Sequence, residues 1–175
     1  DGQRWICAPP LRPEESRRRV AEIVRAGGVD CLATDHCAFT RADKESGGGD
    51  IRRTPGGVAG IGALVPLAFR LYEEEESGTA LIHIGRLLAT GPARIIGHYP
   101  RKGSLQTGAD ADLVVLRSGG PERSIRSSLA DAFETYPGMK TTLAIRALFL
   151  RGRLVVENGE VLEPDTPGGK WLCQK

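Results

Sequence analysis

The stretch Val29-Asp30-Cys31-Leu32-Ala33-Thr34, followed directly by Asp35-His36, indicates the class of fold. It is short and mostly apolar, as expected of a buried strand in a parallel sheet. A helix is predicted before it, because Pro13-Glu14-Glu15 is a typical helix start and Gly27-Gly28 a typical stop. A helix, a buried strand and then a carboxylate at the carboxyl end of that strand are typical of α/β proteins.

The remainder of the first half is predicted to be helical and rich in loops. A short strand is expected over residues 4–8, ended by Pro9-Pro10, and a long glycine-rich loop over residues 41–57. Helices are predicted over residues 61–76, where the helix ends in four consecutive glutamates, over residues 79–89 and over residues 90–97.

Antiparallel β patterns begin near residues 99–102. Asn158-Gly159 is a strong two-residue hairpin signal, and residues 118–128 are expected to form a surface loop. Strands are predicted over residues 103–105, 113–116, 142–150, 154–156 and 160–162. We therefore expect an α/β chain in two parts, residues 1–100 and residues 101–175.

The composition is that of an ordinary soluble protein. Apolar residues make up 40% and charged residues 26% of the 175, with a net charge of +2. This balance gives little drive toward nucleic acid or anionic lipid, and no run of about 18 apolar residues predicts a membrane span. The four irregularly spaced cysteines predict reduced thiols in a cytoplasmic protein.

The beginning of the sequence predicts that further residues precede it. The chain starts at Asp1, and its only methionine is Met139. The first half contains only two predicted parallel strands, whereas a complete barrel of alternating strands and helices needs about 250 residues. We expect this chain to be the C-terminal segment of a longer protein.

Asp35 is the first candidate for chemistry. A carboxylate at the carboxyl end of a buried parallel strand lies where α/β barrels place catalysis, and it can ligate a metal or transfer protons. The alternative is that Asp35 caps the following loop and pairs with an arginine. Position alone favours this alternative.

Other chemical signals in the sequence are weaker. His36 and Cys37 are adjacent and point in different directions on an extended chain, and no C-x-x-C motif is present, so a structural zinc site is not expected. His83 and His98 fit packing or surface positions. The stretch Pro55-Gly56-Gly57-Val58-Ala59-Gly60 is either a backbone cradle for a ligand or a plain mobile connection, and it lacks the phosphate-loop pattern.

Seven segments, taken in order, carry a resemblance to a known family. They are Pro9-Pro10-Leu11-Arg12, Thr34-Asp35-His36-Cys37-Ala38-Phe39, Thr54-Pro55-Gly56-Gly57-Val58-Ala59-Gly60, Gly91-Pro92-Ala93-Arg94, Tyr99-Pro100-Arg101-Lys102-Gly103, Gly108-Ala109-Asp110-Ala111-Asp112-Leu113-Val114-Val115 and Arg151-Gly152-Arg153-Leu154-Val155-Val156. The series resembles the C-terminal part of the dihydropyrimidinase and hydantoinase group of cyclic amidohydrolases. Cys37 and Phe39 favour this group, since dihydroorotases tend to have a second histidine where Phe39 stands.

The resemblance implies a fold, a metal and a set of site residues. The fold would be the C-terminal part of a metal-dependent (β/α)8 barrel, followed by part of a small β-sandwich. Asp35 would complete a two-zinc centre and relay the proton to the leaving amide nitrogen. The backbones of Ala8 and Gly56 would contact the cyclic amide, at positions where many members have serine and asparagine.

The remaining metal ligands of the family have no counterpart here. The family uses a His-x-His pair, a carboxylated lysine and two later histidines, whereas this chain has three histidines, none in a His-x-His pair. We therefore expect the 175 residues alone to be inactive toward cyclic amides. We also expect them to be prone to aggregation, because the edges of the missing strands would be exposed.

Several functions remain open at this stage. The leading hypothesis is a zinc-dependent hydrolase that opens a hydantoin or dihydropyrimidine ring. The alternatives are a dihydroorotase or allantoinase, kept open by Thr34 and Ala38, a non-catalytic assembly partner of the same fold, and a free-standing small binding domain. The resemblance also implies a homo-oligomer, tetramer or dimer, for the complete protein.

Overall fold

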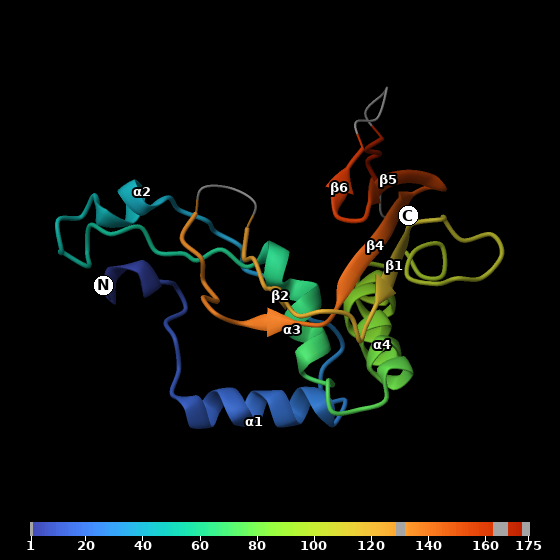
Figure 1. Ribbon diagram of the computed structural model, residues 1–175, viewed down its shortest axis with the longest axis horizontal. Coiled ribbons are helices and arrows are strands. Elements are labelled where there is room, and N and C mark those ends of the chain that lie inside the picture. Colours follow the sequence, from blue (N-terminus) through green and yellow to red (C-terminus); the bar gives the residue numbers. More distant parts are fainter. Residues whose placement is uncertain (1, 129–131, 163–167, 173–175) are drawn as a thin grey trace. The chain divides into compact units, whose positions relative to one another are not determined.

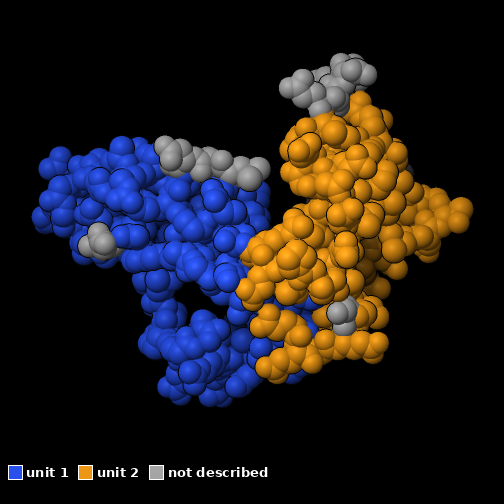
Figure 2. Space-filling view, viewed as in Figure 1, with its two compact units in different colours: residues 1–72, 124–141 blue, residues 73–123, 142–175 orange. Residues whose placement is uncertain are grey.

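The computed structural model describes residues 2–128, 132–162 and 168–172. By internal contacts the chain divides into two compact units, residues 1–72 with 124–141 and residues 73–123 with 142–175 (Figure 2). Among the described residues, no helix combines the length and the apolar character that crossing a membrane requires. Cys7, Cys31 and Cys37 are free thiols, and Cys173 lies outside the described residues.

The first unit consists of short helical elements joined by long irregular segments (Figure 1). Its longest helix, α1 (Glu14–Arg25), begins directly after Pro13 and carries Glu14 and Glu15 in its first turn, as predicted. The other helical elements are η1 (Gly2–Trp5), α2 (Arg41–Glu45), η2 (Ile61–Ala63) and α3 (Leu64–Arg70).

The end of α3 is attached to α1 by hydrogen bonds as well as by packing. Tyr72 is only 1% exposed, and its hydroxyl donates to the carbonyl of Val24 at 3.2 Å. The guanidinium of Arg25 donates to the carbonyl of Leu71 at 2.6 Å. The core of this unit therefore forms where α1 and α3 meet, with Val24, Ala68 and Phe69 buried.

Three predictions for the first unit are wrong. No strand forms over residues 29–34, because a strand is held by ladder hydrogen bonds and none of the described strands pairs with this segment. Residues 4–8 form no strand either, since η1 occupies part of them. The helix predicted over residues 61–76 ends at Arg70, because four glutamates would repel one another next to the negative end of the helix dipole.

Two predicted loops contain more structure than expected. Helix α2 lies within residues 41–57, where the Thr40 hydroxyl accepts from the Asp43 N–H and the Asp43 carboxylate accepts from the Thr40 N–H. Within residues 118–128, β2 (Arg123–Ser124) pairs with β3 (Lys140–Thr141), and Ile125 and Ser127 are buried.

The second unit combines helices with an antiparallel sheet (Figure 1). Helix α4 (Ser77–Gly85) is followed by one π-helical turn, η3 (Arg86–Thr90), and by α5 (Gly91–Ile95). The sheet has the order β1 (Leu113–Arg117), β4 (Ala144–Leu150), β5 (Arg153–Glu157) and β6 (Glu160–Val161). In the register, Leu148 of β4 lies between Val114 of β1 and Val156 of β5.

The predicted strands of this unit are confirmed except for residues 103–105. The hairpin at Asn158-Gly159 has positive φ at both residues, +50° and +89°, as a type I′ turn requires. Gly103 forms no strand because it packs against a helical turn, where a Cβ would lie 2.6 Å from the carbonyl oxygen of Ala89. The side chain of Trp171, near the end of the described residues, is 90% exposed.

A carboxylate and lysine cluster precedes β1. Lys102 forms ion pairs with Asp110 at 2.9 Å and with Asp112, and the Arg151 N–H donates to Asp112 at 2.8 Å. The hydrogen bond from Lys102 lowers the pKa of Asp110. Burial acts to raise the pKa of Asp112, but the bonds from Lys102 and the Arg151 N–H outweigh it, and this pKa is also lowered.

We predict that Asp112→Asn lowers the free energy of unfolding by about 1–2 kcal/mol at pH 7, because a charge-assisted bond is lost. A lowered folded pKa stabilises the fold above the unfolded value of about 3.9, and this stabilisation is lost as pH falls through the folded pKa. The difference between the variant and the wild type in urea unfolding should therefore shrink as pH falls below about 4. Asp30→Asn, at an exposed position, is the control. An equal difference between variant and wild type at pH 7 and pH 3 would contradict the role of the carboxylate charge.

Candidate active site

The three candidate site residues are all exposed and lie on three segments of the first unit. Ala8 follows η1, Asp35 follows the segment predicted as a strand, and Gly56 lies in the glycine-rich stretch before η2. Exposure leaves the Asp35 carboxylate and the backbones of Ala8 and Gly56 accessible to a ligand.

Backbone hydrogen bonds join these three segments. The Gly57 N–H donates to the carbonyl of Ile6 at 3.0 Å, which links the Ala8 segment to the glycine-rich stretch. The Cys37 N–H donates to the carbonyl of Val58 at 3.0 Å, which links the Asp35 segment to the same stretch. The structure therefore brings the three segments together, although they are far apart in the sequence.

Gly57 is required at the crossing of these segments. A Cβ at this position would lie 2.8 Å from both the Cβ and the carbonyl oxygen of Cys37. No side chain fits there unless the backbone moves. Within the stretch from Pro55 to Gly60, Gly57 is thus closely packed against Cys37.

His36 has a structural role that the sequence did not predict. Its Nδ1 accepts hydrogen bonds from the Gly60 N–H at 3.0 Å and from the Ile61 N–H at 3.1 Å, at the start of η2. Because Nδ1 is an acceptor, the ring proton of the neutral imidazole is on Nε2. The only sequence signal for this contact was the presence of a histidine some 25 residues before the glycines that precede a helix start.

Asp35 makes no hydrogen bond or ion pair with any residue in the described ranges, so the predicted alternative of a loop cap paired with arginine is not what the structure contains. Across the same ranges, no group of three His, Cys, Asp or Glu side chains could hold a metal ion. At this site the described residues thus offer the accessible carboxylate of Asp35, but they do not fit a complete metal site.

Lys44 is the buried charge beside this site. It is 1% exposed, and its ammonium donates to the carbonyls of Ile6 and Pro55, each at 2.8 Å. The ring of Phe39 lies 5.3 Å from the nitrogen. Burial lowers the pKa of Lys44 below its usual value. No sequence signal pointed to this residue, because lysine is normally a surface residue.

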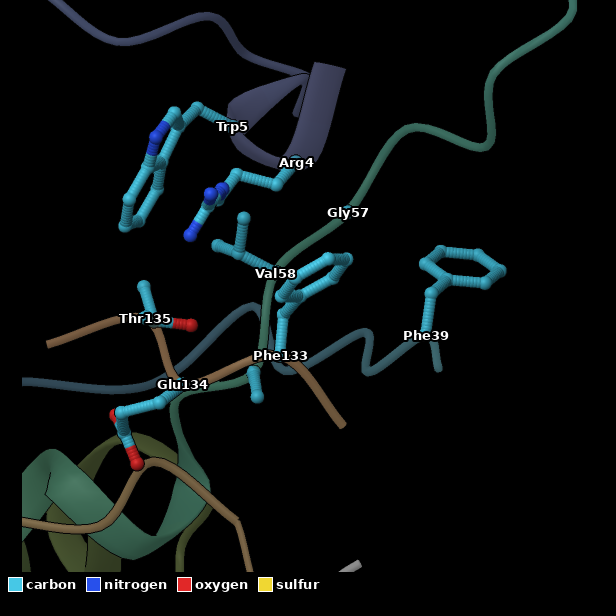
Figure 3. Close-up of a pocket in the computed structure, with 9 residues that line it drawn as sticks. Arg4, Trp5, Phe39, Gly57, Val58, Phe133, Glu134 and Thr135 are labelled. Carbon is cyan, nitrogen blue, oxygen red and sulfur yellow. The ribbon is translucent and has the colours of Figure 1, made fainter. Parts of the chain in front are cut away.

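A small pocket lies against the glycine-rich stretch (Figure 3). Arg4 stands between the rings of Trp5 and Phe133, 5.9 and 5.3 Å from their centroids, and Val58 forms the adjacent wall. Burial acts to raise the pKa of Glu134, but N–H groups of Tyr136 and Ser127 donate to it at 2.9 and 3.0 Å and hold this pKa below its usual value. The complete lining is Arg4, Trp5, Phe39, Gly57, Val58, Ala59, Phe133, Glu134 and Thr135.

Residues 5–162 match the model of the amidohydrolase family. The chain belongs to this family. It is 32% identical over 169 residues to a D-hydantoinase of Streptomyces coelicolor, with 91% of this chain and 34% of that protein covered. It is 29% identical to a dihydropyrimidinase of Arabidopsis thaliana, with 97% of this chain and 32% of that protein covered. The resemblance to the hydantoinase and dihydropyrimidinase group is thus confirmed.

Solved structures agree with the sequence relatives. An L-hydantoinase from Arthrobacter aurescens, 30% identical, superimposes with a TM-score of 0.79 over 93% of this chain and 37% of that one. A D-hydantoinase from Thermus sp., at 23% identity, shares the fold with a TM-score of 0.82, over 93% of this chain and 36% of that one. The amidohydrolase chain described here spans about a third of the length of the relatives it matches.

Proposed function

We propose that this chain supplies the C-terminal part of a zinc-dependent hydrolase that opens the C–N amide bond of hydantoin or dihydropyrimidine rings. The observation that carries the proposal is the pair of backbone hydrogen bonds, from Gly57 to Ile6 and from Cys37 to Val58, that joins the segments carrying Ala8, Asp35 and Gly56. Membership in the amidohydrolase family and the names of its relatives support the choice of cyclic amides as the substrate class.

Asp35 is the proposed proton carrier. Its carboxylate is exposed and free of partners within the described ranges, so it can accept a proton from the attacking water and return it to the leaving nitrogen. We also propose Asp35 as one ligand of a two-zinc centre, with the other ligands contributed from outside the residues described here. Since these residues do not form a metal site by themselves, we derive no step through the metal.

The cyclic amide ring would be held by backbone groups. Ala8 and Gly56 are exposed, and the segments that carry them are fixed by the bond from Gly57 to Ile6. Peptide N–H and C=O groups match the complementary C=O and N–H groups of a cyclic amide. Such contacts do not depend on the side chain, which fits the presence of alanine and glycine at these positions.

The wider architecture follows the same proposal. Residues 1–100 would complete the end of a (β/α)8 barrel, and residues 101–175 would add strands to a small β-sandwich. The antiparallel sheet β1-β4-β5-β6 supports the second assignment. A cytoplasmic location and a dimeric or tetrameric assembly are expectations carried over from the resemblance.

The test is a ring-opening assay on the complete protein that contains this chain, with a hydantoin, a dihydropyrimidine, dihydroorotate and allantoin as substrates. We expect turnover of the first two, at least about tenfold loss after treatment with a chelator, and recovery with Zn²⁺. The 175 residues alone should show no turnover.

Each other outcome overturns a stated part of the proposal. Turnover of dihydroorotate or allantoin alone would replace the substrate class. Full activity after complete metal removal would exclude the zinc dependence. A folded, metal-loaded protein without turnover of any of the four substrates would favour the non-catalytic assembly partner.

A further inference from the structure

The burial of Lys44 has a cost that must be offset. An ammonium withdrawn from water is unfavourable unless it is paired or fully hydrogen-bonded. In the part of the chain that the structure describes, no carboxylate pairs with Lys44; its ammonium contacts two backbone carbonyls and the ring of Phe39. A charge held in this way forms strong bonds to both carbonyls, because charge-assisted bonds exceed neutral ones.

The two carbonyls that accept from Lys44 belong to residues close in the sequence to those proposed to contact the substrate. Ile6 lies two residues before Ala8, and Pro55 lies directly before Gly56. The carbonyl of Ile6 also accepts the Gly57 N–H, so Lys44 and Gly57 share one acceptor. The ammonium therefore joins the backbones on both sides of the proposed ring-binding surface.

We infer that Lys44 is a positioning residue that fixes the backbones of Ala8 and Gly56 at the spacing the cyclic amide requires. This inference rests on the proposed function, because the ring is the substrate proposed above. Lys44 does not itself touch the substrate: it is buried, whereas Ala8 and Gly56 are exposed.

Helix α2 holds the lysine in place. The helix has five residues, and the reciprocal bonds between Thr40 and Asp43, the residue directly before Lys44, fix its start. Phe39, directly before this cap, carries the ring beside the ammonium and also lines the pocket of Figure 3. Residues 39–45 thus supply the ammonium group, the aromatic ring beside it and the helix start that orients both side chains.

The first experiment follows the backbone of this chain within the complete protein by amide hydrogen exchange. Lys44→Met keeps the length of the side chain but removes the charge and the donors. We expect the Gly57 amide to exchange at least about tenfold faster in the variant, because its acceptor loses the second bond that holds it. Lys170→Met, the same replacement at an exposed lysine, should leave that rate unchanged.

The second experiment measures kinetics of the complete protein. Backbone contacts act on the bound ring in the ground state and in the transition state alike, so their misplacement should raise KM about five- to tenfold and change kcat less than twofold. Asp112→Asn, which weakens the other unit, should leave KM unchanged. A merely structural role of Lys44 would instead lower the fraction of folded enzyme, and thus the apparent kcat at constant KM.

The outcomes separate the two proposals. An unchanged Gly57 exchange rate, or an unchanged KM in a folded Lys44→Met variant, would overturn the role of Lys44. Should Lys44→Met not fold, Lys44→Arg carries the test, because it keeps the charge but alters the donor geometry; a raised KM supports the inference and a wild-type KM overturns it. A wild type without turnover contradicts the proposed function, while the exchange experiment still decides whether Lys44 holds this backbone.

Discussion

Asp35→Asn in the complete protein is expected to lower kcat for ring opening by about a thousandfold. The asparagine keeps the size of the side chain but can neither accept the proton nor return it to the leaving nitrogen. General acid–base groups contribute typically 10²–10⁴-fold, and the lost negative charge also weakens metal binding. The measurement is a steady-state assay at saturating substrate and saturating Zn²⁺, which keeps metal occupancy from limiting the rate.

The control for this prediction is Asp30→Asn. Asp30 is exposed like Asp35 and lies five residues earlier, at the other end of the segment predicted as a strand. It should retain wild-type kcat. If Asp35→Asn keeps more than about a tenth of the wild-type rate, Asp35 is not the proton carrier. Such a result would mean that Asp35 is an ordinary surface carboxylate.

Gly57→Ala is expected to lower the free energy of unfolding of the chain by about 2–3 kcal/mol. The added Cβ would lie 2.8 Å from the carbonyl oxygen of Cys37, and that oxygen belongs to the backbone and cannot rotate away. Overpacking of this kind costs typically 1–3 kcal/mol, and the bond from Gly57 to Ile6 would be strained as well. The entropy gained by replacing glycine, about 0.4–1 kcal/mol, does not offset this. Urea unfolding of the 175-residue chain is the measurement.

The adjacent glycine provides a matched control. A Cβ at Gly56 would meet no atom within 4 Å, so Gly56→Ala should change stability by less than about 0.5 kcal/mol. Equal destabilisation by both substitutions would mean that the stretch responds to any lost glycine, and not to the contact with Cys37.

Features that depend on near neighbours in the sequence could be predicted. The Asn158-Gly159 hairpin, the start of α1 after Pro13 and the strands β1, β4 and β5 follow from local turn chemistry and apolar patterns. The end of α3 could have been placed better, because the repulsion among Glu73, Glu74, Glu75 and Glu76 is also a local effect.

Features that depend on partners distant in the sequence could not be predicted. Residues 29–34 have the composition of a buried strand, but a strand needs a neighbour, and composition does not show whether one is present. The burial of Lys44 depends on carbonyls 38 and 11 residues away, and the ring of His36 reaches N–H groups 24 and 25 residues ahead. Asp35 was a candidate from its position after the predicted strand, whereas its role and the residues Ala8 and Gly56 came from a resemblance. These roles stay predictions until the variants are measured.

The places of the two tryptophans have a practical consequence for these experiments. Trp5 is half-buried beside Arg4 and the pocket of the first unit, whereas Trp171 belongs to the second unit and is 90% exposed. Trp171 should already emit as an indole in water does in the folded state. Unfolding should therefore shift its emission maximum very little to longer wavelength. A red shift or a change in quenching therefore reports on Trp5, and optical spectroscopy can follow the first unit without any attached label.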